Sequence, residues 1–180
     1  IEAWFKAKKT LLNKTGKFED LKDVCEKHLQ IIASNIGELS KQYAVAYYEY
    51  ADYFRLIKDY DSLIEFRLKQ IEIHENLIKD DPTLSWDLKI SYTNMAYYYM
   101  DYFKDYDNAL KFALKSLEIV QNAKGIPEHS IASTHYWLAE VYYFGKKYDE
   151  AIKYYNNAIT HKIKAYGKGH SEIASCQLAM

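Results

Sequence analysis

The stretch FGKKYDEAIKYYNNAI, residues 144–159, decides the fold, because its outline recurs along the chain. It appears again as YFKDYDNALKFALKSL at 102–117 and as RLIKDYDSLIEFRLKQ at 55–70. A fainter copy, TGKFEDLKDVCEKHLQ, occupies 15–30. Self-similarity at a fixed period is typical of solenoid proteins, in which small structural units stack on their neighbours.

An aromatic residue marks the same place in each copy. These residues are Phe18, Tyr60, Tyr106 and Tyr148, so the intervals between copies are 42, 46 and 42 residues. Proline and glycine, the residues that helix interiors exclude, occur only two and six times in the chain. The period and the scarcity of helix breakers together predict units made of long helices.

Each copy contains two apolar stripes separated by a short turn, which in the last copy lies at Gly145. The stripe before the turn holds Ile131, His135, Leu138, Ala139 and Tyr142, and the stripe after it holds Tyr148, Ala151, Ile152, Tyr155, Ala158 and Ile159. Steps of three and four residues are typical of amphipathic helices. A short turn between two helices makes them antiparallel.

The other copies vary this pattern. In the copy that precedes the last one, the turn before Tyr106 is one residue longer. The first copy is degenerate, and we expect its first helix to bury Trp4, Ala7 and Leu11. These differences predict one repeat array over 1–180, and its repeats lie at about 1–34 (degenerate), 36–80, 84–124, 128–165 and 170–180 (truncated).

The stretch LAEVYYFGKKYDEAIKYYNNAI, residues 138–159, resembles a tetratricopeptide repeat. The residues that carry the resemblance are Leu138, Ala139, Tyr142, Gly145, Tyr148, Ala151, Tyr155 and Ala158. A period near 42 residues is similar to that of the longer subtype found in kinesin light chains and in many bacterial regulators. The resemblance implies an all-α fold, a right-handed α-solenoid of antiparallel helix pairs. It also implies a scaffold that binds proteins or peptides in a concave groove.

Composition excludes several classes of protein. A hydrophobic fraction of 49% excludes a disordered chain, and a charged fraction of 27% without a long apolar run excludes a membrane span. Lys and Arg number 24 against 25 Asp and Glu, so no charge excess indicates nucleic acid or an anionic membrane as partner. Two cysteines without CxxC spacing, Cys25 and Cys176, favour a reducing, cytoplasmic setting.

Tyrosine is the most conspicuous residue, with 19 copies, and we expect most of them to pack in the core. Some tyrosines fall off the core stripe, and we expect the face of each first helix that turns away from the second helix to line a concave groove. This face predicts a peptide-binding groove with Tyr48, Asp52, Arg55, Thr93, Tyr97, Met100, Tyr136, Glu140 and Tyr143. Tyrosine suits peptide recognition because it offers a large contact area at low entropy cost. The face carries more acid than base, which disfavours the family's carboxylate clamp for chaperone tails.

Other functions were weighed against peptide binding. Cys25 and His28 lie three residues apart, which is the spacing of a nucleophile and base, but no orienting third group is evident. No histidine pairs with another histidine or cysteine at four-residue spacing, so we predict neither a metal nor a cofactor. An alternative is a peptide-sensing module of a larger bacterial-type regulator or effector, with any catalysis outside this chain. Self-association through the ends of the array is also consistent with the sequence.

Overall fold

The computed structural model describes residues 2–123, 125–168, 171 and 173. In this part of the chain it contains eight α-helices, one short 3-10 helix, one π-helix and no strand, which confirms the all-α prediction. The chain divides into two compact units, residues 1–84 and 85–180. Each unit is considered by itself below.

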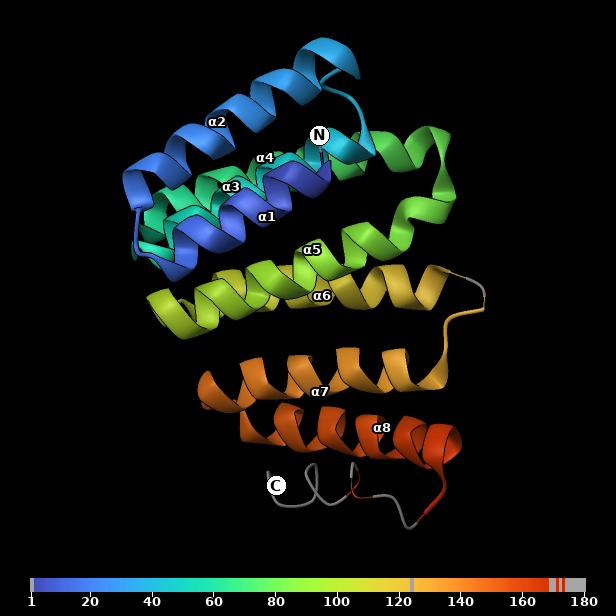
Figure 1. Ribbon diagram of the computed structural model, residues 1–180. Helices are drawn as coiled ribbons and strands as arrows, with labels where there is room; N and C mark the ends of the chain where they lie inside the picture. The colour runs from blue at the N-terminus through green and yellow to red at the C-terminus, as the bar shows by residue number, and fades with distance from the viewer. Residues whose placement is uncertain (1, 124, 169–170, 172, 174–180) are drawn as a thin grey trace. The chain divides into compact units, whose positions relative to one another are not determined.

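The first unit contains two helix pairs (Figure 1). Its helices are α1 (Glu2–Lys14), α2 (Phe18–Asn35), α3 (Lys41–Leu56) and α4 (Tyr60–Asp80), and the short 3-10 helix η1 (Pro82–Leu84) follows them. Each helix contacts the next one along the chain.

The second unit also contains two pairs. Helix α5 (Ser85–Tyr98) continues into the π-helix η2 (Tyr99–Phe103), and α6 (Tyr106–Asn122), α7 (Glu128–Phe144) and α8 (Tyr148–Tyr166) follow. Figure 1 shows α7 and α8 side by side and running in opposite directions. The predicted antiparallel helix pairs are therefore present in this unit.

The aromatic residue that marks each copy is the first residue of the second helix of its pair: Phe18, Tyr60, Tyr106 and Tyr148. Aspartate caps two of these helices. The Asp59 carboxylate accepts a hydrogen bond from the Ser62 amide, and the Asp105 carboxylate accepts one from the Asn108 amide. Such caps satisfy amides that have no partner within the helix, so they fix where the second helix begins.

The turn within each pair contains a residue with left-handed backbone geometry, two positions before the aromatic residue. These residues are Gly16, Lys58, Lys104 and Lys146, and their φ angles are 67°, 62°, 55° and 61°. Glycine adopts this geometry freely, whereas a lysine side chain is strained in it. The turn of the last copy includes Gly145, as predicted, but Gly145 has φ −76° and Lys146 takes the left-handed position.

The extra residue in the third copy is not accommodated in the turn. In the last copy, the Lys147 amide closes the turn by donating to the Tyr142 carbonyl, five residues back. In the third copy, the Asp105 amide donates to the Tyr99 carbonyl, six residues back. The end of the first helix has widened into the π-helix η2, which absorbs the insertion. The prediction of a longer turn is therefore wrong.

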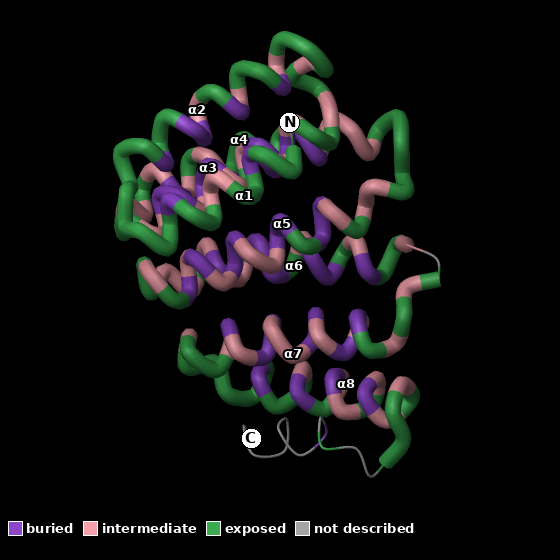
Figure 2. The backbone as a smooth tube through the Cα atoms, viewed as in Figure 1, coloured by how far each residue is buried: buried purple, intermediate pink, exposed green. Residues whose placement is uncertain are grey.

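Small residues and one tyrosine form the centre of the last pair. Ala139 of α7 and Ala151 and Tyr155 of α8 are almost fully buried, and partly buried tyrosines pack around them. Buried and exposed residues alternate along α7 and α8 (Figure 2). Alanine lets the two helix axes approach, and the Tyr155 ring fills the space beside them. Tyr148, by contrast, is 53% exposed, so its predicted place in the core is wrong.

Helix α1 buries a different stripe from the predicted one. Trp4 and Leu11 are 63% and 56% exposed, whereas Phe5 is 1% and Leu12 is 3% exposed. The Phe5 ring stacks on the buried His28 imidazole of α2, with ring centroids 3.7 Å apart. This contact turns the neighbouring Trp4 outward.

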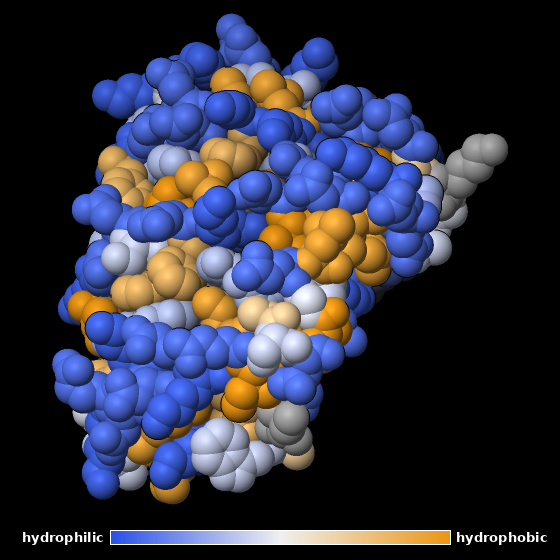
Figure 3. Space-filling model, turned by 90° about the horizontal axis from the view of Figure 1, so that it is seen from above, coloured by the Kyte–Doolittle hydropathy of each residue, from blue (hydrophilic) through white to orange (hydrophobic). Residues whose placement is uncertain are grey.

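Hydrophobic side chains also reach the surface in patches between hydrophilic ones (Figure 3).

Candidate functional site

In the first unit, the candidate face on α3 contains Tyr48, Asp52 and Arg55. One face of the exposed Tyr48 ring is covered by the Arg67 guanidinium of α4, whose central carbon lies 3.9 Å from the ring centroid. Arg67 is only 2% exposed, and it donates a hydrogen bond to the Gln70 side-chain oxygen at 3.1 Å. The contact is a buried cation–π interaction.

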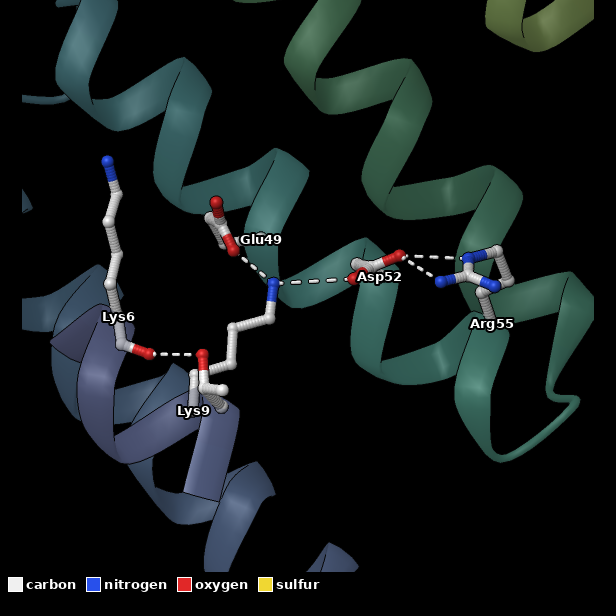
Figure 4. A network of polar contacts seen from close by, with 6 residues as sticks. Lys6, Lys9, Glu49, Asp52 and Arg55 are labelled. Carbon is white, nitrogen blue, oxygen red and sulfur yellow. Dashed lines mark hydrogen bonds and ion pairs between the residues drawn. The ribbon is translucent and has the colours of Figure 1, made fainter. Parts of the chain in front are cut away.

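Asp52 lies in a charged network that joins α1 to α3 (Figure 4). Lys9 of α1 forms ion pairs with Glu49 and with Asp52, the second at 3.4 Å. Arg55 donates to Asp52 through Nε at 2.8 Å and through Nη2 at 2.7 Å. Burial raises the pKa of Asp52, but the hydrogen bond from Arg55 and the charge of Lys9 outweigh it, so the pKa is lowered overall. Asp52 and Arg55 therefore neutralise each other on this face.

In the second unit, Thr93, Tyr97 and Met100 occupy different surroundings. The Thr93 hydroxyl lies 2.9 Å from the Ser116 hydroxyl of α6, beside a cavity of about 10 Å³ that the Trp137 side chain also lines. Met100 is buried in the π-helix. Of the three, only Tyr97 combines partial exposure with a contact to the next first helix, α7.

The α7 residues Tyr136, Glu140 and Tyr143 form a stripe above the buried Tyr155. The Tyr155 hydroxyl donates to the Glu140 carboxylate at 2.5 Å, and the Tyr136 and Tyr155 rings meet edge to face at 5.7 Å. Burial and this hydrogen bond raise the pKa of Tyr155, so its hydroxyl remains a donor at neutral pH. Tyr143 is 44% exposed. The structure thus brings Tyr136 and Glu140 together around one buried tyrosine.

The sequence reasoning missed Trp137 and Asp101, and Trp137 connects α5 to α7. The Tyr97 ring meets the Trp137 ring at 5.9 Å and 78°, and Trp137 meets Tyr136 at 6.2 Å and 80°. The Tyr97 hydroxyl donates to the Asp101 carboxylate at 3.1 Å. We call Tyr97, Tyr136 and Trp137 the aromatic cluster. The four-residue spacing of Tyr97 and Asp101 could have revealed the second of the missed residues, since such pairs meet on a helix.

A separate cavity of about 340 Å³ opens beside the start of α6 and the end of α7. Lys104 and Lys147 line it together with Asp105 and Asp107. Two lysines and two aspartates thus line this cavity, so its charged groups favour neither an anion nor a cation.

The Cys25 and His28 pair lacks the properties of a nucleophile and its base. Burial raises the pKa of the Cys25 thiol to about 12, so it stays protonated at neutral pH. Burial also lowers the pKa of His28, whose ring stacks on Phe5. Across the described residues, no three His, Cys, Asp or Glu side chains gather as a metal ion would require. Nor does any helix in this part of the chain have the length and apolar character needed to cross a membrane.

Comparison with solved structures identifies the fold. A kinesin-light-chain protein of Podosopora anserina, built from nearly identical TPR-like repeats, superposes with a TM-score of 0.76 at 13% identity. The match covers 98% of this chain and 82% of that one. The chain folds as a tetratricopeptide-like repeat protein. This confirms the fold that the repeat at 138–159 implied.

Two further structures support the same TPR-like fold. BtubC (BKLC) of P. vanneervenii matches with a TM-score of 0.75 and 19% identity, over 93% of this chain and 65% of its own. The apo form of RapI matches with a TM-score of 0.78 and 17% identity, over 97% of this chain and 45% of its own. The TPR-like chain thus spans less than half the length of RapI. No protein-family model and no curated protein matches the sequence.

Two histidines, His135 of α7 and His161 of α8, pack together in the TPR-like chain and predict a stability that depends on pH. The buried His135 ring lies 5.4 Å from the His161 ring and 5.8 Å from the Tyr154 ring, and His161 Nδ1 lies 2.6 Å from a Glu128 oxygen. Burial, with a smaller contribution from the His161 charge, lowers the pKa of His135 from 6.5 to about 4. The unfolded chain therefore binds a proton more readily than the folded one between these values.

We expect the free energy of unfolding to fall as the pH decreases from about 6.5 to about 4. Replacing His135 with phenylalanine should flatten this dependence, because the ring remains while the titrating group is removed. Urea unfolding followed by circular dichroism at several pH values measures the effect. The exposed His129, changed to alanine, is the matched control, and an equal flattening in that variant would contradict the assignment to His135.

Proposed function

We propose that the TPR-like chain is a protein- or peptide-binding scaffold module, and that its ligand lies on the first helices of the pairs. The observation that carries this proposal is the aromatic cluster of Tyr97, Tyr136 and Trp137, which spans α5 and α7 and is only partly buried. Aromatic side chains dominate the energetics of protein interfaces because they bury large areas with few rotatable bonds.

The surroundings of the aromatic cluster support this proposal. The Trp137 ring packs edge to face on both the Tyr97 ring and the Tyr136 ring. These contacts already restrict the side chains, so little conformational entropy is lost when a ligand binds. The π-helix η2 begins two residues after Tyr97, and π-bulges inserted in α-helices are frequent at functional sites. The solved TPR-like structures share the fold, which is consistent with a scaffold but does not specify its ligand.

Replacing Tyr97 and Trp137 together with alanine should weaken peptide binding by at least about tenfold, since buried aromatic anchors contribute most of the affinity at such surfaces. The measurement begins with peptides selected from a random phage-displayed library on the wild-type chain. The affinities of synthetic copies are then compared by fluorescence anisotropy for the wild-type and variant chains.

The exposed Tyr166 of α8, changed to alanine, is the control for the loss of a tyrosine. Circular dichroism should show unchanged helicity in both variants. Peptides that bind the double variant as tightly as the wild-type chain would place the binding surface elsewhere and refute the proposal.

Self-association through the ends of the array is a second proposal. Trp4 and Leu11 are exposed on one side of α1, and they are the apolar side chains that a second copy would contact. Sedimentation velocity over a concentration series, with a Trp4→Glu and Leu11→Glu double variant beside the wild-type chain, measures this association. A wild-type chain that stays monomeric at every concentration would refute it.

A further inference from the structure

The aromatic cluster is flanked by two carboxylates whose positions are fixed by tyrosine hydroxyls. On α5, Tyr97 donates to Asp101 at 3.1 Å, and on α8, Tyr155 donates to Glu140 at 2.5 Å. Each bond occupies one oxygen of its carboxylate, so the other oxygen can accept from a ligand. Asp101 lies in η2, which continues α5, and Glu140 lies on α7.

In the described part of the second unit, neither Asp101 nor Glu140 has a close, buried ion pair. The Lys104 ammonium lies 3.8 Å from Asp101, but the side chain is 65% exposed, so this pair is weak. The Glu140 carboxylate has no ion pair with a described residue. This contrasts with the first unit, where Arg55 and Lys9 both contact Asp52. Asp101 and Glu140 therefore lack the close double pairing that neutralises Asp52 in the first unit.

The rings themselves suit a cation. The chain already places its own cations over tyrosine faces: Arg67 lies 3.9 Å from the Tyr48 centroid, and Lys162 lies 5.3 Å from the Tyr136 centroid. Tyr97 and Trp137, by contrast, pack edge to face on other aromatic rings, and among the described residues no cation lies over either ring. Tryptophan provides the strongest cation–π partner of the aromatic side chains.

We propose that the ligand of this face is a peptide with an arginine side chain, which stacks on Trp137 or Tyr97 and pairs with Glu140 or Asp101. This inference rests on the proposed function. Arginine fits better than lysine because its planar guanidinium stacks on a ring while its N–H groups donate to a carboxylate. An acidic peptide would meet two like charges on this face and bind weakly.

The phage-selected peptides also test this inference. We expect arginine to be enriched among them, and replacement of the enriched arginine by citrulline to weaken binding about tenfold, because citrulline keeps the shape and removes the charge. The Glu140→Gln and Asp101→Asn variants should weaken the arginine peptide by a similar factor and leave the citrulline peptide nearly unchanged. Glutamine and asparagine still accept the hydrogen bonds from Tyr155 and Tyr97, so the fold is preserved.

Glu118→Gln on α6 is the matched control, because it removes an equal charge from an exposed position outside the aromatic cluster. Peptides that need Tyr97 and Trp137 but show no arginine enrichment and no loss with citrulline would overturn the arginine assignment and leave the peptide-binding proposal standing. Peptides that bind independently of Tyr97 and Trp137 would overturn both proposals. If the Glu118 and Glu140 variants lost equal peptide affinity, the effect would depend on the net charge of the chain and not on the position of the carboxylate. That result would also overturn the assignment.

Discussion

Replacing Tyr155 with alanine is expected to lower the free energy of unfolding by about 3–5 kcal/mol, the usual cost of removing a large buried aromatic side chain. The ring is 1% exposed and fills the space that Ala139 and Ala151 leave between α7 and α8. Its loss creates a cavity that the two helix backbones cannot close. The variant also loses the hydroxyl that donates to Glu140.

Urea unfolding followed by circular dichroism measures this loss. The control is Tyr148→Ala on the same helix, which should cost less than about 1 kcal/mol because the ring is exposed. A Tyr155→Phe variant separates the two contributions, since it keeps the ring and removes only the hydrogen bond. If the Tyr148 and Tyr155 alanine variants lost equal stability, the packing described for α7 and α8 would be wrong.

Replacing Lys58, Lys104 and Lys146 with glycine should raise the free energy of unfolding by about 1 kcal/mol per site and by about 3 kcal/mol for all three. Each lysine has a positive φ angle, in which its Cβ crowds the following carbonyl. Glycine relieves this crowding, and the gain exceeds the entropy that its flexibility adds to the unfolded chain. The Lys104 ion pair with Asp101 is exposed, so its loss subtracts little.

Lys147 provides the matched control, because it follows Lys146 directly but has φ −96°. Lys147→Gly should lower the stability by about 0.5–1 kcal/mol, since no strain is relieved and only the flexibility of the unfolded chain increases. Thermal and urea unfolding of the four single variants give the comparison. A stabilising effect at Lys147, or none at the three left-handed lysines, would contradict the argument.

The sequence was sufficient to predict where the second helices begin. The aromatic anchors repeat at a nearly constant period, and in all four pairs the second helix begins at its anchor, as at Tyr60 and Tyr106. This worked because local signals agree there: a turn and the start of an apolar stripe lie within a few residues, and in two of the four pairs a capping aspartate lies between them.

The buried side of α1 could not be predicted in this way. Trp4 and Leu11 have the same seven-residue spacing as Phe5 and Leu12, so both stripes satisfy the helical period. They differ by a rotation of about 100° around the helix, which corresponds to one residue. Phe5 is buried because its ring stacks on His28 of α2. This contact joins two helices, so the periodicity of α1 alone cannot predict it.

The candidate site was predicted in part. Tyr97, Tyr136 and Glu140 were selected by their face on each helix, and the structure gives them contacts on the second unit that fit recognition. Trp137 was missed because it lies about 100° around the helix from Tyr136, between the predicted face and the core. Whether the nine predicted residues form one peptide-binding groove remains a prediction.

The π-helix η2 shows how this architecture can change its length. An insertion in a loop between packed helices would move the second helix along its partner, whereas the residue inserted before Tyr106 leaves the left-handed turn residue and the aspartate cap in place. The helix end has expanded by one residue, and the turn after it still has its left-handed residue, as in the other copies. Engineers who wish to lengthen a repeat should therefore insert the residue in the last turn of the first helix. The same rule offers a route by which repeats of unequal length arise during evolution without the loss of helix pairing.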